Sequence, residues 1–323
     1  MKNFAHVNAR GLDEAIAALQ RYGKRAAVIA GGTDLLGKMK DEILPAYPEA
    51  LVNIKTIPGL DRIEEKDGTL FIGALARLED IATNSSILDT YPSLAEAARR
   101  TASTHLREMG TIGGNICQDI RCWYYRSQNN RFACLRKGGG RCYAIDGDNR
   151  YHSIFGGSVE QGCYAVHPSD TAPALIALDA TIKTPRRSIK AEDFFQVSVA
   201  KTTVLDDDEI VTQIQIPKPF GKSAFVKFAL RKAIDFPIVN CAAMVTVSKK
   251  KVTAARICLN AVYVKPYRAT HAEEAIKGKT INEANAEAAG AAAVSSARPM
   301  PYNAYMVQIA KSMVMRAILG CAS

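Results

Sequence analysis

Residues 26–35 read Ala-Ala-Val-Ile-Ala-Gly-Gly-Thr-Asp-Leu. The run 26–30 is short and apolar and stops at two glycines, which predicts a buried strand that ends in a tight turn. Glycines let a phosphate approach exposed backbone N–H groups without a Cβ in the way, so this turn is a candidate diphosphate cradle. The frame is neither G-x-G-x-x-G nor a P-loop, and a plain tight turn explains it equally well.

A second element of the same kind, Thr111-Ile112-Gly113-Gly114-Asn115, lies further along the chain. Two such turns are suited to holding one extended dinucleotide from both sides. The pair therefore strengthens the prediction of a phosphate-bearing cofactor, which either element alone supports only weakly.

Periodicity predicts the elements around these turns. We expect helices near 12–19, 93–102, 171–179, 272–277, 282–293 and 302–319. We expect strands near 51–54, 70–72, 180–183, 210–216, 225–230, 242–248 and 256–264. The Pro-Lys-Pro-Phe-Gly stretch at 217–221 is the predicted domain boundary.

The composition excludes several classes of protein. With 323 residues, 48% of them hydrophobic, the chain is long enough for two or three domains, and no apolar stretch predicts a membrane span. The net charge of +10 is dispersed, which favours a solvated surface, then an acidic partner or anionic cofactor, and disfavours nucleic acid. The N-terminus lacks a charged start followed by an apolar run, so we expect a cytoplasmic protein.

Five of the eight cysteines lie between residues 117 and 163. Their spacings are wide and contain no C-x-x-C pair, which disfavours a compact zinc knuckle. The segment is rich in turn residues and has no periodicity. It is therefore predicted to be a long insertion that needs an internal cross-link in place of a hydrophobic core. An iron–sulfur cluster, structural zinc and unligated core cysteines remain open. Cys241 and Cys258 lie in apolar strand patterns and are expected in the core, and Cys321 is near the C-terminus.

A series of motifs runs along the whole chain: Ala30-Gly31-Gly32-Thr33-Asp34-Leu35, Gly73-Ala74, Arg107 with Gly110-Thr111-Ile112-Gly113-Gly114-Asn115, Ser169-Asp170, and Lys227 with Arg231 and Asp235. In content and order this series resembles the FAD-binding subunit of the molybdenum hydroxylases, a family that includes xanthine dehydrogenase and carbon monoxide dehydrogenase. The resemblance implies an α+β fold: a two-part FAD domain of the p-cresol methylhydroxylase type, then a smaller antiparallel sheet with helices. The expected domains are 1–217, with lobes of about 1–57 and 58–217 and an inserted loop of about 118–166, and 218–323.

The insertion resembles the β subunit of 4-hydroxybenzoyl-CoA reductase, in which the loop carries a 4Fe-4S cluster. By this resemblance the cluster ligands are Cys122, Cys134, Cys142 and Cys163. Cys117 falls where the family often has a small residue beside the flavin, so it is left out of the ligand set. The spacing from Cys142 to Cys163 is longer than expected for that reductase, which bears on the substrate more than on the cluster.

The same resemblance implies roles for individual residues. The backbone of Ile29, Ala30, Gly31, Gly32, Thr33, Asp34 and Leu35 would hold the FAD diphosphate, and Thr111, Gly114 and Asn115 would close its other side. Asp170 would accept hydrogen bonds from ribityl or ribose hydroxyls, Lys227 would lie near the isoalloxazine or its ribityl chain, and Ile210 would supply apolar contact. The alternatives are a helix N-terminal residue for Asp170, an ordinary strand lysine for Lys227 and a core position for Ile210.

No catalytic residue is predicted, because the five histidines share no motif and no nucleophile has a recognisable base. The chain is therefore expected to transfer electrons and not to carry out substrate chemistry. The resemblance implies a relay between an external carrier such as ferredoxin, a 4Fe-4S cluster, FAD, and the 2Fe-2S clusters of a small partner subunit. A large partner subunit would hold the molybdenum cofactor in a dimer of heterotrimers. The resemblance favours reductive ring dehydroxylation of an aromatic CoA ester. The alternatives are outward electron flow in a hydroxylase of N-heterocycles or aldehydes, and a zinc-stapled interaction module without flavin.

Overall fold

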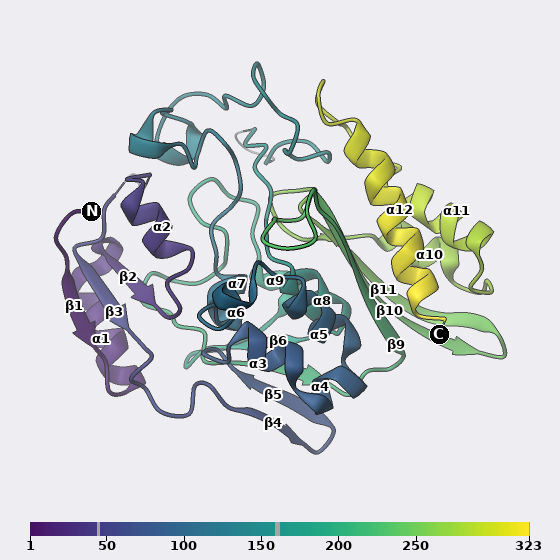
Figure 1. Cartoon of the computed structure of the whole chain (residues 1–323), viewed down its shortest axis with the longest axis horizontal. Helices are drawn as coiled ribbons and strands as arrows, with labels where there is room; N and C mark the ends of the chain where they lie inside the picture. Colours follow the sequence, from purple (N-terminus) through teal and green to yellow (C-terminus); the bar gives the residue numbers. More distant parts are fainter. Residues whose placement is uncertain (44–45, 159–161, 323) are drawn as a thin grey trace.

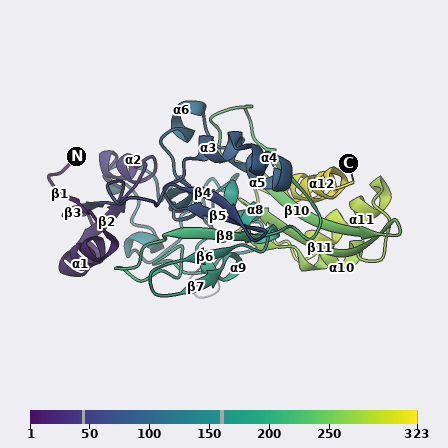
Figure 2. The same cartoon turned by 90° about the horizontal axis from the view of Figure 1, so that it is seen from below.

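The structure is a computed structural model that describes residues 1–43, 46–158 and 162–322. Its strands form three separate sheets. Figure 2 shows them in a row, with the first sheet at one end, the second in the middle and the third at the other end. The mixed helix-and-sheet class predicted from the sequence is confirmed.

The first sheet is parallel and has the order β1-β3-β2. Its strands are β1 (Ala5–Asn8), β2 (Ala26–Ile29) and β3 (Ala50–Asn53). Helix α1 (Leu12–Tyr22) packs against β2 and β3 and buries Ala15 and Leu19 beneath it. As the apolar run predicted, a strand precedes the paired glycines: β2 ends at Ile29, two residues before Gly31, and α2 (Leu35–Lys40) begins three residues after Gly32.

The second sheet is antiparallel and has the order β4-β5-β8-β6-β7. Its strands are β4 (Ile63–Lys66), β5 (Thr69–Gly73), β6 (Thr181–Lys183), β7 (Ser188–Lys190) and β8 (Gln213–Pro217). The helices of this region are α3 (Leu78–Thr83), α4 (Ser85–Thr90), α5 (Pro92–Arg99), α6 (Thr104–Arg107), α7 (Ile112–Ile116), α8 (Thr171–Ala177) and α9 (Ala191–Phe194). Strand β8 pairs with both β5 and β6, which joins segments far apart in the sequence.

The third sheet is antiparallel and has the order β12-β11-β10-β9. Its elements are β9 (Lys222–Phe228), β10 (Val239–Ser248), β11 (Lys251–Asn260), β12 (Tyr267–Arg268), α10 (Thr270–Ile276), α11 (Glu283–Ala293) and α12 (Tyr305–Gly320). Side chains alternate between the two faces of a strand, and both faces of β10 are buried. Ala242 and Met244 join the core of the second sheet, while Cys241 and Ala243 join the core under α10 to α12. The buried positions predicted for Cys241 and Cys258 are confirmed.

The cysteine segment lies between α7 and α8. Its described residues form only the 3-10 turns η2 (Gln128–Asn130) and η3 (Leu135–Lys137) and isolated bridges, as its lack of periodicity predicted. The bridge between Arg121 and Val166 closes its base. The segment, teal in Figure 1, extends from the end of α2, where Asn129 bonds to Asp41, to the start of α12.

Sequence periodicity missed β1, β4 and β7, which are short and largely exposed, so their residues carry little hydrophobic pattern. It also placed the start of β8 at residue 210, whereas the strand begins at Gln213 and Ile210 precedes it. Among the described residues, no helix is long and apolar enough to cross a membrane.

Candidate functional site

The two glycine elements meet in space. A Cβ on Gly31 would lie 1.9 Å from the carbonyl oxygen of Met109 and 3.1 Å from the Cα of Gly110, so only glycine allows this approach. Gly32 has φ of +72°, a backbone conformation that also favours glycine. Gly31 is thus required by the contact with the second element, and Gly32 by its own backbone conformation, in addition to any role toward a ligand.

The first element leaves backbone donors free. Within the part of the chain that the structure describes, the N–H groups of Gly32, Thr33 and Asp34 donate no hydrogen bond. In the second element these groups are used internally: Ile112 N–H bonds to Ala76 O, and Gly113 N–H bonds to Ala74 O. Consecutive free N–H groups in a turn form an anion-binding concavity, so the turn at Gly32 is the part of the site suited to a phosphate.

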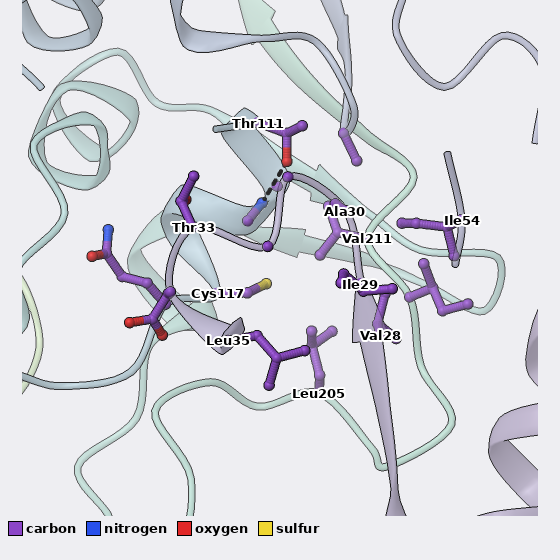
Figure 3. A pocket seen from close by; sticks show the side chains of 18 of the residues that line it. Val28, Ile29, Ala30, Thr33, Leu35, Ile54, Thr111, Cys117, Leu205 and Val211 are labelled. Carbon is purple, nitrogen blue, oxygen red and sulfur yellow. Dashed lines mark hydrogen bonds between the residues drawn. The ribbon is translucent and has the colours of Figure 1, made fainter. Parts of the chain in front are cut away.

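A cleft of about 250 Å³ opens between the two elements. Its apolar end is formed by Val28, Ile54, Leu205, Ile210 and Val211 (Figure 3). At the other end, the hydroxyl oxygen of Thr111 accepts the Gly114 N–H at 3.2 Å and caps α7. The sulfur of Cys117 faces this cleft in Figure 3, and Cys117 is exposed.

A second cavity of about 220 Å³ continues from the first, because Thr33, Asp34, Thr111 and Gly114 line both. It extends past Asn115 to Asp170 and to the loop at Ile234 and Phe236. The two cavities form one elongated site with an apolar end, an anion-binding middle and a polar far end. This shape suits an extended dinucleotide.

Both oxygens of the Asp34 carboxylate are bonded to other groups of the chain. It accepts hydrogen bonds from Arg126 Nη1 at 2.7 Å and from the Asp119 N–H at 3.0 Å, and Lys38 Nζ lies 3.7 Å away. These three contacts hold the Asp34 side chain in place. Its side chain ties the first glycine turn to the start of the cysteine segment.

Asp119 lies at the centre of the same network. Burial alone would raise the pKa of its carboxyl, but Lys38 at 3.2 Å, the hydroxyl of Tyr125 at 2.5 Å and the charge of Arg126 lower it well below the usual range. The carboxylate thus stays ionised between a cation of α2 and a tyrosine of the cysteine segment.

At the far end of the site, Asp170 is buried and paired. Its carboxylate accepts from Lys227 Nζ at 2.6 Å and from Asn240 Nδ2 at 2.7 Å. Burial raises the pKa of Asp170, and the contacts with Lys227 and Asn240 oppose that shift. Lys227 also donates to Arg100 O at 2.8 Å, so the protein holds the ammonium behind the Asp170 carboxylate.

The side chain of Asn115 is fixed by two hydroxyls. Its oxygen accepts from Ser169 Oγ at 2.5 Å and from Thr171 Oγ1 at 2.7 Å. These bonds join the second glycine element to the start of α8, next to Asp170. The structure places Thr111, Gly114, Asn115 and Asp170 around one cavity.

The four cysteines predicted to hold a cluster are buried or half-buried in the cysteine segment. Burial raises the pKa of the Cys122 thiol to about 12, with further contributions from Cys163 and Cys142. Burial also raises the pKa of Cys134, to which Cys163 contributes, and that of Cys142, to which Cys163 and Cys134 contribute. Charge on Cys163 thus acts on the other three thiols. Among the described residues, however, no group of three or more His, Cys, Asp or Glu side chains is placed to hold a single metal ion.

Nitrogen donors surround these thiols. Arg136 Nε donates to Cys163 Sγ at 3.4 Å, and His152 Nε2 lies 3.2 Å from Cys122 Sγ. Burial lowers the pKa of Lys137, while the Cys134 and Cys122 thiols raise it.

Sequence reasoning missed Arg126, Asn240 and the apolar residues Val28, Ile54 and Val211. Arg126 and Asn240 stand outside the motifs, and each is far in sequence from the aspartate it contacts. Val28, Ile54 and Val211 lie in or beside apolar runs, where core packing explains them equally well. The pairing of Lys227 with Asp170 was missed for the same reason as Arg126 and Asn240, although both residues were predicted for the site.

Comparisons with known proteins agree across the whole chain. Residues 2–219 match the FAD-binding domain of molybdopterin dehydrogenases, and residues 224–321 match the C-terminal domain of the carbon monoxide dehydrogenase flavoprotein. The chain is 33% identical over 322 residues to the FAD-binding subunit of an aldehyde oxidoreductase of Escherichia coli, covering 96% of each protein. It is 26% identical over 284 residues to the medium chain of a glyceraldehyde dehydrogenase of Sulfolobus acidocaldarius, covering 87% of this chain and 83% of that one.

The fold agrees as well. The solved structure of the carbon monoxide dehydrogenase of Hydrogenophaga pseudoflava contains a chain that matches this one with a TM-score of 0.78 and 26% identity. The match covers 99% of this chain and 98% of that chain. The fold predicted from the motif series, an FAD-binding domain followed by a smaller sheet with helices, is confirmed.

Proposed function

This chain belongs to the FAD-binding subunits of the molybdopterin dehydrogenases, and from that premise we propose that it binds FAD along its elongated site and relays electrons between a substrate-oxidising partner and an external acceptor. Like its relatives it is a subunit of an oxidoreductase, with the substrate chemistry on partner chains. The observation that carries the proposal is the turn at Gly32: its residues line the cleft, and their N–H groups donate no hydrogen bond within the described part of the chain.

The proposed FAD contacts follow the geometry. The backbone from Ile29 to Leu35 would hold the diphosphate, with Gly32, Thr33 and Asp34 as the N–H donors. Thr111 would donate its hydroxyl hydrogen, because its oxygen already accepts from Gly114. Ile210 and its apolar neighbours would cover the end of the cofactor that lies in the first cavity.

At the far end, Asp170 would accept ribityl hydroxyls through carboxylate lone pairs that Lys227 and Asn240 leave free. Lys227 would act through Asp170 and by its charge. Bound FAD supplies an acceptor that exchanges electrons singly or in pairs. The chain's own contribution is to hold it in a fixed position and, through Lys227, to place a positive charge near the end where reduction occurs.

For the direction of electron flow we propose oxidation of an aldehyde, with electrons leaving through this subunit. The named relatives are an aldehyde oxidoreductase and dehydrogenases, which favours the outward alternative. The reductive dehydroxylation of an aromatic CoA ester, favoured from the cysteine loop, has no support among these relatives. We therefore replace it as the main interpretation.

We further propose that Cys122, Cys134, Cys142 and Cys163 bind one 4Fe-4S cluster. In such a cluster each thiolate binds a different iron, so the sulfurs stay further apart than around one ion. This is consistent with four thiols whose charges interact although no single-ion site is present among the described residues. Structural zinc is less well supported, because tetrahedral zinc requires its ligands around one point.

The assembly is proposed from the same relatives. Two of them are a medium chain and an FAD-binding subunit, so we propose a large molybdenum-cofactor subunit and a small 2Fe-2S subunit as partners, in a dimer of heterotrimers. Ferredoxin remains a candidate external carrier. Within this chain we propose domain boundaries at 1–217 and 218–323, with lobes of about 1–57 and 58–217 and the cysteine loop at about 118–166.

The test is anaerobic mixing of the purified complex with an aldehyde while the flavin absorbance is followed. Bleaching of the flavin by the aldehyde, and recovery on adding an electron acceptor, is the expected result. A complex that contains no flavin defeats the FAD assignment. If reduced ferredoxin bleaches the flavin but the aldehyde does not, electrons do not leave the complex through this subunit. That result would favour the reduction of an aromatic CoA ester again.

A further inference from the structure

A third cavity, of about 530 Å³, lies beside the far end of the elongated site. Pro168, Asp235 and Phe236 line both this cavity and the one that reaches Asp170. Its volume falls within the range of about 300–1,000 Å³ that is usual for small-molecule sites. The proposed FAD contacts leave this cavity without a ligand.

Aromatic rings from two segments of the chain form its walls. Trp123 and Tyr151 come from the cysteine segment, and their ring centres are 5.1 Å apart. Leu230 and Phe236 come from the loop between β9 and β10, and both side chains are exposed. Because aromatic rings pack favourably against other rings, these walls suit a planar aromatic ligand.

Arg121 is the unpaired charge of the third cavity. Within the part of the chain that the structure describes, its guanidinium donates no hydrogen bond and forms no ion pair. The other arginine and the carboxylate of the lining are paired, because Arg126 Nη1 donates to Asp34 at 2.7 Å and Asp235 accepts from Arg231 Nε at 3.0 Å. The cavity therefore has one positive charge that no protein group is bonded to.

The position of the Arg121 guanidinium favours one kind of partner. Its Cζ lies 3.3 Å from the centre of the Phe236 ring, so the ring covers one face of the guanidinium and leaves the N–H groups at its edge for an acceptor. A carboxylate suits these groups, because the planar fork of an arginine can donate two parallel hydrogen bonds to it. A nucleotide phosphate is less well suited, since no glycine turn lines this cavity.

We propose that the third cavity binds a planar aromatic carboxylate, with its ring against Trp123 and Phe236 and its carboxylate on Arg121. This inference requires neither bound FAD nor a cluster, because every group that makes these contacts belongs to the chain itself. Only the source of the ligand rests on the proposed function: oxidation of an aromatic aldehyde yields an acid of this class.

The experiment is a fluorescence titration of the full chain. Trp123 is the only tryptophan of the sequence and lines the cavity, so its emission reports on this site. Added 4-nitrobenzoate should quench the emission with saturation, whereas acetate, which has no ring, should not. Nitrobenzene, which has the ring but no carboxylate, should bind about tenfold more weakly, because it forms no charge-assisted pair with Arg121.

Arg121→Met should weaken the binding of 4-nitrobenzoate by about tenfold and leave that of nitrobenzene nearly unchanged, a difference that a purely structural role would not produce. Arg121→Lys should keep part of the affinity, since it retains the charge without the planar fork. The matched control is Arg141→Met, which should bind like the wild type. Arg141 is an exposed cation of the same segment that lies over Tyr143 at 4.4 Å and does not line the cavity.

Leu230→Asp provides a second test should the Arg121 variants fail to fold. Leu230 lines the cavity but is 71% exposed, so the change leaves the core intact. The added negative charge should weaken the binding of 4-nitrobenzoate and not that of nitrobenzene.

Three results would overturn the inference. The first is an absence of saturable quenching in the wild type, and the second is an equal affinity for 4-nitrobenzoate and nitrobenzene, or for 4-nitrobenzoate with and without Arg121. The third is loss of binding when the chain is loaded with FAD, because the cavity would then belong to the cofactor site. A chain that binds 4-nitrobenzoate but no flavin contradicts only the proposed function, so the two failures are distinguishable.

Discussion

Gly31 is held against the backbone of Met109, and this contact makes it the most sensitive position of the cofactor site. Gly31→Ala would put a Cβ 1.9 Å from a carbonyl oxygen that no side-chain rotation can move, so the two glycine elements must separate. We expect the variant to bind much less flavin, measured as flavin absorbance per mole of purified chain.

The control is Gly37→Ala in α2, where an added Cβ meets nothing within 4 Å. That change should leave the flavin content unchanged and stabilise the helix by about 0.5–1 kcal/mol. Normal flavin content in the Gly31 variant would contradict the proposed cradle.

The labelling rate of Cys117 reports whether a cofactor covers the cleft. Its thiol faces the cleft, whereas Cys134, Cys142, Cys163, Cys241, Cys258 and Cys321 are buried and Cys122 is half-buried. Because Cys117 is exposed, its alkylation at pH 8 can be followed by mass spectrometry.

We expect maleimide to label Cys117 in flavin-free protein and to label it far more slowly after FAD is restored. Cys117→Ser identifies the labelled site. Equal labelling with and without FAD would mean that the cofactor does not cover this cleft.

Burial of His167 makes the stability of the folded chain depend on pH. Its side chain is fully buried, and burial lowers its pKa to about 3. In the unfolded chain a histidine binds a proton near pH 6.5, so protonation favours unfolding below that value. The contribution of His167 to stability is therefore complete above pH 6.5 and is lost as the pH falls from about 6.5 to about 3.

In urea unfolding between pH 7.5 and 5.5, His167→Gln should lower the stability at pH 7.5 but reduce its loss with falling pH, by up to about 1.4 kcal/mol per pH unit. The control, His105→Gln, changes an exposed residue of α6 and should leave the slope as in the wild type. An unaltered slope in the His167 variant would show that His167 is not a buried neutral group.

At the scale of elements, Arg126 joins α2 to the cysteine segment. Besides Asp34, its guanidinium donates to Ile120 O and Asp119 O, each at 2.9 Å. Hydrogen bonds that involve a charged group contribute about 1.5–3 kcal/mol each, so Arg126→Met removes the main anchor of the loop and leaves the Asp34 carboxylate without its cation.

We predict that Arg126→Met lowers the iron content and speeds tryptic cleavage within residues 118–166. Its comparison is Arg131→Met, since Arg131 is exposed and its nearest ring contact is Phe132 at 5.6 Å. If both variants keep their iron and resist trypsin equally, Arg126 does not anchor the loop.

The elements also show what a sequence can predict. The strand before Gly31 and the turn after it were predictable, because an apolar run and two glycines impose a local conformation. The pairing of Asp34 with Arg126 joins residues 92 positions apart and depends on how two loops fold together, for which no local pattern exists. The cluster at the cysteines comes from a family resemblance and stays a prediction, because their wide spacing alone leaves the alternatives open.

At the scale of the whole molecule, the third sheet lies between two cores. Phe225, Ala242, Met244 and Cys258 on one face belong to the core of the second sheet, and the opposite face packs under α10 to α12. Residues 218–323 form a sheet with its own helices, but one of its faces is completed only by the preceding domain. The sequence boundary near 217 is therefore not expected to separate two independent folding units.

We predict that residues 218–323, expressed alone, bind a hydrophobic dye such as ANS and aggregate, because the face that carries Met244 is then exposed. Met244→Lys tests the cause. In the isolated fragment this change should reduce dye binding and increase solubility, whereas in the full chain it buries a charge without a partner and should lower the stability by several kcal/mol. Val247→Lys, at an exposed position of the same strand, should change neither protein much. A fragment that is soluble, binds no dye and unfolds cooperatively would show that the C-terminal domain does not depend on the FAD domain for its core.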